Sequence, residues 1–262
     1  MAFFMEELTV KEMEGVMEKT KTVIIPVGLP EQHGFHLPLS TDILNAVIPP
    51  RIAGDRLNAV VAPSVNYCFS GGELMGTINV SPNAFGIYMS EICSEFIRLG
   101  FKNIVILLGH GGSENTDALR NTLQMLLRRD KERTKDVAIA MMDVQELSPT
   151  GMKAVEEHDY HAGLIETSNM LYWRPDMVRS EIVLDKPEIA ENLRTDPDWY
   201  ALHEKVVDNP FVIERVQQRE EIKVGVMGYP EKANRELGEK VSGEIVDNLV
   251  ALVDSLEKRL SK

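Results

Sequence analysis

The sequence predicts an α/β protein with three layers, in which a largely parallel central sheet is flanked by helices. Short apolar runs, typical of buried strands, alternate along the chain with longer segments that carry apolar residues at helical spacing. No Gly/Ser-rich linker and no internal repeat divides the 262 residues, of which 44% are hydrophobic. We therefore expect residues 1–262 to form a single domain with one sizeable core.

The expected strands are continuous apolar runs, which indicate burial on both faces of a parallel sheet. The clearest of them, "KNIVILLG", is closed by a glycine. We predict strands at 22–28, 58–65, 102–109, 137–143 and 222–228.

Helices are expected between these strands. The helix at 42–57 contains Pro49 and Pro50, which should interrupt or end it. Gly100 is placed to end one helix, and Ser113 to cap the start of the next. The predicted helices span 42–57, 84–100, 113–130, 163–173 and about 231–260. The polar segment at about 186–220 is expected to be a helical excursion on the surface, over the site or in an oligomer contact.

Composition excludes several classes of protein. The net charge is −13 and no basic patch is visible, which argues against a nucleic-acid partner. No segment approaches 18 consecutive apolar residues, so we expect no membrane span, and the acidic N-terminus does not resemble a signal peptide. A cytoplasmic location is the default expectation. The two cysteines, Cys68 and Cys93, are expected to be buried free thiols.

Polar side chains gather where three predicted strands are followed by loops. These segments are 28–42, 109–115 and 156–168, and they hold five of the six histidines. Ligands of open α/β sheets bind beyond the carboxyl ends of the strands. The sequence therefore predicts one functional site at this edge of the sheet.

The segment "GLPEQHGFHLPLSTD" has too many glycines and prolines to form a helix and carries side chains suited to metal binding. Glu31 and His33 are two residues apart and would point the same way on an extended chain, and Asp42 returns toward them. Imidazole and carboxylate without thiolate suit zinc, manganese or iron. A carboxylate such as Asp42 can bridge two metals about 3.5–4 Å apart. Acid–base catalysis without a metal remains the alternative at this point.

Three motifs in order, "PVGLPEQHGFHLPLSTD", "LLGHGGSEN" and "HAGLIETSNML", resemble the creatininase family of metal-dependent amidohydrolases. The likeness runs from about residue 20 to 180 and resumes at 225–241. It implies two divalent metal ions per chain, commonly zinc or manganese. It places Glu31, Asp42 and His110 around one ion and His33 with Asp42 around the other. It also implies a homo-oligomer, often a hexamer built as a trimer of dimers.

The chain departs from creatininase itself at two places. Gly112 stands where that enzyme has a metal-binding glutamate, so another carboxylate must fill the position. We prefer Glu166 over Glu114, because Glu114 would point away on a helix. The segment "EEHDY" also lacks the tryptophan that helps creatininase to hold creatinine, so we do not expect creatinine as the substrate.

The resemblance assigns further roles. His161 would protonate the leaving group, and Asp159 would orient that histidine. Ser70 matches a substrate-contacting serine, and the glycines Gly111 and Gly112 would let a substrate approach the backbone closely. Three further histidines are treated separately: His36 is expected next to the metal ligands without binding metal, His158 is left undecided, and His203 is expected on the surface.

The expected function is hydrolysis of a small cyclic substrate, such as a cyclic amide, by attack of metal-bound hydroxide on a carbonyl. One alternative is carbon–carbon hydrolysis of a cyclic polyol diketone in inositol catabolism, which a relative in this family performs. A second alternative is a non-catalytic metal-binding homologue. Retention of Glu31, His33, Asp42 and His110 favours an enzyme.

Overall fold

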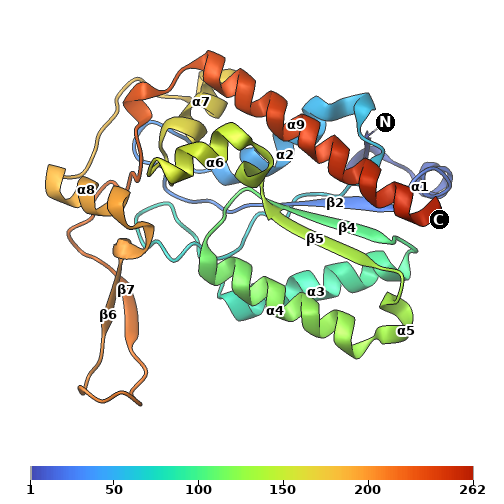
Figure 1. The fold of residues 1–262 in the computed structure, drawn as a ribbon, viewed down its shortest axis with the longest axis horizontal. Coiled ribbons are helices and arrows are strands. Elements are labelled where there is room, and N and C mark those ends of the chain that lie inside the picture. Colours follow the sequence, from blue (N-terminus) through green and yellow to red (C-terminus); the bar gives the residue numbers. More distant parts are fainter. Residues whose placement is uncertain (1, 262) are drawn as a thin grey trace.

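The central sheet of the computed structural model, which describes residues 2–261, consists of five parallel strands in the order β1-β3-β2-β4-β5 (Figure 1). The predicted α/β class with a largely parallel sheet is therefore confirmed. The strands are β1 (Ala2–Phe4), β2 (Thr22–Val27), β3 (Ala59–Val61), β4 (Asn103–Leu108) and β5 (Ala138–Asp143).

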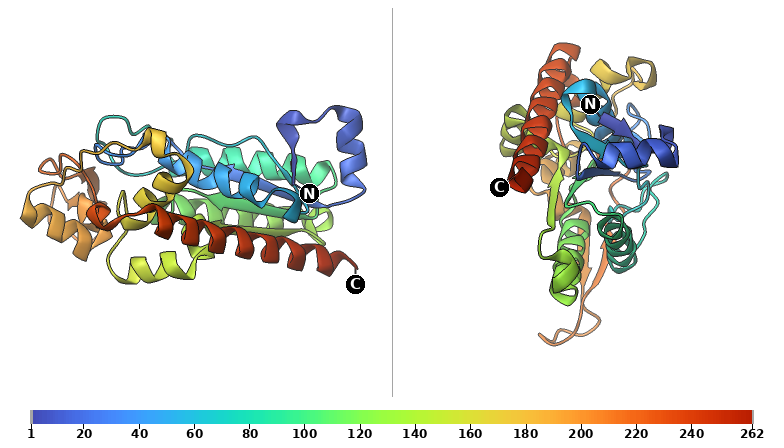
Figure 2. Two further views of the ribbon diagram at one scale, coloured as in Figure 1. Left: turned by 90° about the horizontal axis from the view of Figure 1, so that it is seen from above. Right: turned by 90° about the vertical axis from the view of Figure 1, so that its right-hand side faces the viewer.

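Helices cover both faces of this sheet (Figure 2). Helices α3 and α4 pack on one face, and α2, α6, α7 and α9 pack on the other. Their bounds are α1 (Val10–Met17), α2 (Thr41–Ala53), α3 (Pro82–Arg98), α4 (Ser113–Arg129), α5 (Lys131–Thr134), α6 (Pro149–Glu156), α7 (Leu164–Trp173), α8 (Pro187–Thr195) and α9 (Arg235–Lys258).

Each central strand contributes to two separate cores. In β2, Val23 and Ile25 point into the core under α3 and α4, whereas Ile24 points into the core under α9. Successive side chains of a strand point to opposite faces, so a strand covered on both faces must be apolar throughout. This explains why the sequence shows continuous apolar runs instead of alternation.

The register of the sheet decides where the site can form. In register, β2 pairs with β4 up to Val27 and Leu108, and β4 pairs with β5 up to Leu108 and Asp143. The carboxyl ends of β2, β4 and β5 therefore finish level with one another. The segments that follow these three strands therefore lie beside one another at this edge of the sheet.

Two of the predicted strands differ from the observed structure. Within the run 58–65 only β3 is a strand, although Val65 forms a single bridge with Val27. The run 222–228 is not a strand, although Met227 forms a single bridge with His161. Val224 and Val226 are buried in a small cluster with Ala162, so their apolar character reflects packing and not sheet pairing. Gly225, with a φ of 75°, also breaks the extended conformation.

Helix α2 continues through Pro49 and Pro50 to Ala53, so the prediction that the prolines interrupt it is wrong. Each proline removes one helix hydrogen bond. Both rings are buried, and the apolar contact they gain offsets that loss. The chain leaves the helix at Gly54, whose φ is 49°.

The segment 186–220 is helical only in part. After α8 it forms an antiparallel hairpin of β6 (Ala201–Glu204) and β7 (Arg215–Gln218), which projects from the body of the molecule (Figure 1). The expectation of a wholly helical excursion is therefore corrected. Within residues 2–261, none of the helices has the length and apolar character needed to cross a membrane.

Candidate metal centre

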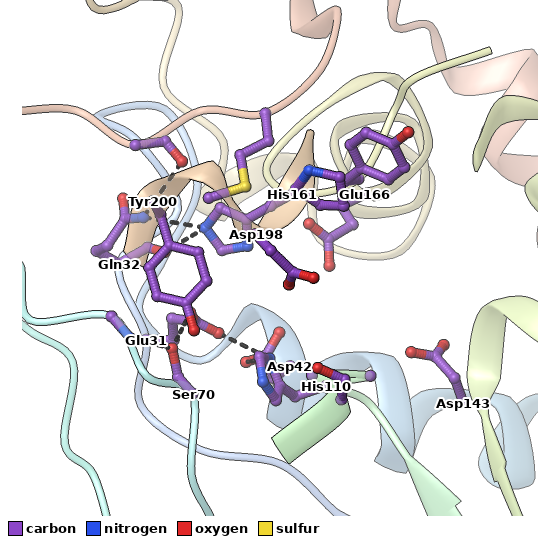
Figure 3. A pocket seen from close by; sticks show the side chains of 18 of the residues that line it. Glu31, Gln32, Asp42, Ser70, His110, Asp143, His161, Glu166, Asp198 and Tyr200 are labelled. Carbon is purple, nitrogen blue, oxygen red and sulfur yellow. Dashed lines mark hydrogen bonds and ion pairs between the residues drawn. The ribbon is translucent and has the colours of Figure 1, made fainter. Parts of the chain in front are cut away.

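Five side chains proposed as metal ligands meet at the carboxyl edge of the sheet, and Figure 3 labels all of them except His33. They come from the loop after β2, from the first turn of α2, from the end of β4 and from the first turn of α7. The converging residues are Glu31, His33, Asp42, His110 and Glu166. Sequence positions more than a hundred residues apart thus share one site because the three strands end level.

One group of residues that could hold a metal ion consists of Glu31, His33 and His161, and two others share Asp42. In one of these two, Nε2 of His33 lies 3.1 Å from Oδ1 of Asp42 and 3.6 Å from Oε2 of Glu166. In the other, Nδ1 of His110 lies 3.0 Å from Oε2 of Glu31 and 3.7 Å from Oδ2 of Asp42. The two carboxylate oxygens of Asp42 therefore face different groups, as a bridging ligand requires.

The donor atoms fit divalent cations. Oε2 of Glu31, Nε2 of His33 and Oδ2 of Asp42 are buried and have no hydrogen-bond partner among the described residues. Leaving such groups buried and unpaired is costly. Within each group the potential ligand atoms lie within 4.8 Å of one another. A set of carboxylate oxygens and imidazole nitrogens suits zinc or manganese.

Electrostatics in the cluster indicate a site that lacks positive charge. Burial raises the pKa of the Asp42 carboxyl, His33 opposes this shift and Glu31 adds to it, and the resulting pKa is about 8. For His33, burial alone would lower the pKa, but Asp42 and Glu166 outweigh it and hold the pKa well above its usual value. A bound cation would balance the negative charge of Asp42 and Glu166, as a protonated His33 does in its absence.

The loop after β2 is held rigidly. The backbone N–H of Glu31 donates to the carbonyl of Leu39 at 3.0 Å, which closes the loop. Nδ1 of His33 lies 3.1 Å from the carbonyl oxygen of Glu31, which leaves Nε2 directed at Asp42. Gly34 adopts a φ of 62°, a conformation that favours glycine. The glycines and prolines of this loop thus fix the positions of the proposed metal ligands Glu31 and His33.

The structure brings Glu166, and not Glu114, into the cluster. Oε1 of Glu166 accepts a hydrogen bond from Nδ2 of Asn45 at 3.0 Å, and Oε2 accepts one from the backbone N–H of Ala162 at 2.7 Å. Glu114 is exposed on α4 and belongs to none of the three groups that could hold a metal. The geometry therefore supports Glu166 as the carboxylate that replaces the one missing at Gly112.

His161 lies beside the cluster, with its ring centroid 4.3 Å from that of His33. Its Nε2 lies 2.8 Å from the carbonyl oxygen of Gln32. Burial lowers the pKa of His161, and the neighbouring His33 lowers it further. A neutral imidazole at this position can accept or release a proton near neutral pH.

Asp159 does not contact His161, so the expected orienting role is corrected. Its carboxylate accepts hydrogen bonds from the backbone N–H groups of Leu164 at 2.7 Å, Ile165 at 3.0 Å and Tyr229 at 3.0 Å. A carboxylate at this position satisfies the free donors at the start of α7. Asp159 therefore acts on the site indirectly, by fixing the helix that carries Glu166.

The residues expected to contact substrate line the same pocket, which has a volume of about 500 Å³. The hydroxyl of Ser70 hydrogen-bonds to the carboxylate of Glu31, so it supports a proposed ligand. A side chain at Gly111 would overlap Asp143, and a Cβ at Gly112 would lie only 2.5 Å from Nε2 of His110. Both positions therefore require glycine.

The remaining histidines lie outside the cluster. His36 is buried, and its Nε2 lies 3.0 Å from the hydroxyl oxygen of Thr167 in α7. His158 is exposed, with Nδ1 3.2 Å from the hydroxyl oxygen of Tyr160. His203 lies on the hairpin, 3.2 Å from a carboxylate oxygen of Glu214.

Several pocket residues were not found by sequence reasoning. Asp143 ends β5, and the rule that located the other strand-end clusters would have found it. Asn45 follows Asp42 by three residues on the same helix face. Asp198 and Tyr200 enter the pocket from the segment before the hairpin, and no sequence signal pointed to them.

The fold and the cluster together define a class: an α/β protein with a carboxylate–imidazole metal centre at the carboxyl edge of a parallel sheet. The model of the Creatininase family, described as creatinine amidohydrolase, matches residues 6–253. The chain belongs to this family of metal-dependent hydrolases, as its motifs predicted.

Relatives with different substrates match the chain. A creatinine amidohydrolase of Pseudomonas putida is 28% identical over 203 residues, covering 70% of this chain and 76% of that protein. A mycofactocin precursor peptide peptidase of Mycobacterium ulcerans is 25% identical over 247 residues, covering 88% and 84%. A 3-dehydro-scyllo-inosose hydrolase of Thermotoga maritima is 25% identical over 111 residues, covering 41% and 36%.

Solved structures share the fold. A manganese creatininase superposes with a TM-score of 0.78 over 98% of this chain and 99% of its own, at 22% identity. A mutant creatininase of the Zn-Zn type superposes with a TM-score of 0.77, over 98% and 99% of the two chains, also at 22% identity.

Proposed function

We propose that this protein hydrolyses an amide bond in a small, cyclic substrate, with two divalent ions held by Glu31, His33, Asp42, His110 and Glu166. The observation that carries the proposal is the position of Asp42, whose two oxygens face two separate groups of ligand atoms. Zinc and manganese suit this donor set.

The chemistry divides between the ions and the chain. Bound divalent ions polarise a carbonyl oxygen and activate water at neutral pH. His161, beside His33, is positioned to give a proton to the departing nitrogen when the carbon–nitrogen bond breaks. Ser70 holds the carboxylate of Glu31, and the bare backbone of Gly111 and Gly112 leaves room for the substrate.

Amide hydrolysis is favoured by the relatives that cover most of the chain. The creatinine amidohydrolase and the peptidase both carry names that denote cleavage of a carbon–nitrogen bond. Creatinine itself is not our choice of substrate, because the segment 156–160 has no tryptophan. A linear peptide amide is a second form of the same chemistry, and the peptidase relative supports its inclusion in any assay.

Carbon–carbon hydrolysis of a cyclic polyol diketone is the second candidate. Its support is the similarity to the 3-dehydro-scyllo-inosose hydrolase, which extends over 41% of this chain. A polar pocket of about 500 Å³ accommodates such a polyol. A panel of cyclic amides, peptides and cyclic diketones, assayed with the zinc-loaded and manganese-loaded protein, separates the two reactions.

Metal analysis tests the centre without knowledge of the substrate. We expect about two ions per chain, and Asp42→Ala should abolish binding of both because this residue faces both groups. Asp254→Ala, an exposed position on α9, is the matched control and should retain both ions. Retention of both ions by Asp42→Ala would refute the shared-ligand assignment. Less than one ion in the unmodified protein would favour a non-catalytic homologue.

We also propose that the chain forms a homo-oligomer, a hexamer built as a trimer of dimers. The support is the projecting hairpin, where Phe211 and Ile213 are each 92% exposed. Large apolar side chains that are this exposed are typical of surfaces that contact another protein.

A further inference from the structure

The wall of the pocket carries many acidic side chains beside apolar ones. Among the lining residues within 2–261 there is no lysine or arginine. The carboxylates that line the pocket are Glu31, Asp42, Glu114, Asp143, Glu146, Glu166 and Asp198. Such a wall repels anions and favours cations.

Glu114 and Asp198 line the pocket together with Tyr200, and these three residues are called the outer group; Figure 3 labels Asp198 and Tyr200. The Tyr200 hydroxyl and Oε2 of Glu114 approach the same point, beside Gly71. Burial raises the pKa of the Tyr200 hydroxyl, Glu114, Asp198 and Glu31 add to this shift, and the resulting pKa is about 12. Two acidic side chains and a hydroxyl oxygen therefore surround one part of the pocket.

Arg219, which contacts Trp199 between Asp198 and Tyr200, is engaged elsewhere. The guanidinium of Arg219 lies 4.5 Å from the ring centroid of Trp199 and donates to the carbonyl of Trp199 at 2.7 Å. It also lies 3.7 Å from a carboxylate oxygen of Glu221. Arg219 does not line the pocket, so it leaves the charge of the outer group uncompensated.

A separate observation marks this cavity as a ligand site. Oδ2 of Asp42 lines the same cavity, its side chain is only 2% exposed, and it has no hydrogen-bond partner among the described residues. This unpaired oxygen belongs to the proposed metal centre, which places the centre and the acidic side chains in one cavity.

The carboxylates that line the pocket differ in whether another group compensates their negative charge. Two divalent ions would carry four positive charges, whereas seven carboxylates line the pocket, so negative charge would remain in excess. Asp143 and Glu146 each accept a backbone hydrogen bond within their own turn. Glu114 and Asp198 are exposed and have no ion-pair partner within residues 2–261, so their charge is available to a cationic ligand.

We propose that the substrate carries a protonated amine, which Glu114, Asp198 and Tyr200 hold while the amide carbonyl lies at the metal centre. This inference rests on the proposed function. A hydroxyl group would form hydrogen bonds with the same residues, but it would leave the negative charge uncompensated. Ion pairs with exposed carboxylates are individually weak, so the effect should come from two carboxylates together.

Calorimetric binding of matched probes tests the proposal. The probes are linear ω-amino amides and ω-hydroxy amides of equal chain length, titrated into the zinc-loaded protein. We expect the amine to bind about tenfold more tightly than the hydroxyl compound, with Glu114→Gln and Asp198→Asn each reducing this ratio about threefold. Glu204→Gln, an exposed carboxylate on the hairpin outside the pocket, should leave the ratio unchanged.

Equal binding of the two probes, binding of neither, or a preference that survives the double variant would overturn the proposal. The metal content of each variant, measured alongside, should stay at that of the unmodified protein. If only the amine proposal is wrong, the protein should contain the expected metal and hydrolyse its substrate but bind the amine and hydroxyl probes equally. Failure of the proposed function would instead show as absent metal or absent hydrolysis, whatever the probe preference.

Discussion

At the scale of single residues, one carboxylate organises the proposed centre. Asp42 lies in the first turn of α2, where its two oxygens reach His33 on one side and His110 on the other. Glu31 and Glu166 complete the two groups from different segments of the chain. If both groups hold an ion as we propose, loss of Asp42 should affect both.

The choice between Glu166 and Glu114 leads to a direct prediction. Glu166→Gln should lower the metal content by about one ion per chain, because it removes a charged oxygen 3.6 Å from Nε2 of His33. Glu114→Gln should retain both ions, since Glu114 lies outside the metal-binding groups. Elemental analysis of the purified variants measures this. The reverse result would transfer the ligand role to Glu114.

At the scale of elements, the site depends on how closely α7 packs against α9. A side chain at Gly238 of α9 would overlap the carbonyl oxygen of Ser168 in α7. Glycine at this crossing lets the two helices approach, and α7 carries Glu166 into the cluster. The position of Glu166 therefore depends on the contact between α7 and Gly238 of α9.

Gly238→Ala should lower the free energy of unfolding by about 2 kcal/mol, because the added methyl group forces the helices apart. Gly243→Ala on the same helix is the matched control. No atom lies within 4 Å of a Cβ built there, so this change should stabilise the protein by about 0.5 kcal/mol. Urea unfolding followed by circular dichroism measures both. Equal effects of the two changes would contradict the packing argument.

Glu244 of α9 connects that helix to the start of α6. Its carboxylate accepts hydrogen bonds from the Ser148 hydroxyl at 2.6 Å and from the backbone N–H of Thr150 at 2.9 Å. Burial raises the pKa of Glu244, but these hydrogen bonds outweigh it, so the pKa lies below its usual value of 4.5.

The stabilisation from Glu244 should therefore be complete above pH 4.5 and lost as the pH falls through the lower pKa of the folded state. Glu244→Gln should cost about 0.5 kcal/mol at pH 7, a small effect because the group is partly exposed. The difference from the unmodified protein should vanish in unfolding experiments at strongly acid pH. A cost that did not depend on pH would show that the charge plays no part.

At the scale of the whole molecule, the hairpin and the two termini lie at opposite ends (Figure 1). The hairpin exposes Val206, Val207, Phe211 and Ile213, and the segment leading into it places Asp198 and Tyr200 in the pocket. An oligomer contact through the hairpin would therefore also hold the pocket wall in place.

The double change Phe211→Ser and Ile213→Ser should lower the mass of the assembly in solution, because it removes the most exposed apolar side chains of the hairpin. Val10→Ser, 80% exposed on α1, is the control and should leave the mass unchanged. Light scattering after size-exclusion chromatography measures the mass. An unmodified protein that is monomeric would refute the oligomer proposal itself.

Much of the fold and most of the proposed site could be predicted from the sequence, for identifiable reasons. Strands buried on both faces are continuously apolar, so β2, β4 and β5 could be located within about two residues at each end. Their carboxyl ends carry the acids and histidines, so the edge that holds the cluster followed as well. The single-domain organisation of residues 1–262 stays a prediction.

Other features depended on contacts that have no local signal. The run 222–228 is apolar because it packs on Ala162, and the pattern alone cannot tell this from sheet pairing. Asp159 lies two residues before His161, yet its carboxylate turns to the backbone of α7. Asp198 enters the pocket only because the segment before the hairpin folds back over it.

The sequence by itself determined which residue types reach the carboxyl edge of the sheet, because strand order along the chain and strand ends are encoded locally. Only the tertiary structure decided how they are shared: that Asp42 faces two groups, that Glu166 and not Glu114 joins them, and that the outer wall is acidic. Those outcomes depend on the register of the strands and the crossing of α7 and α9, which bring together residues far apart in the chain.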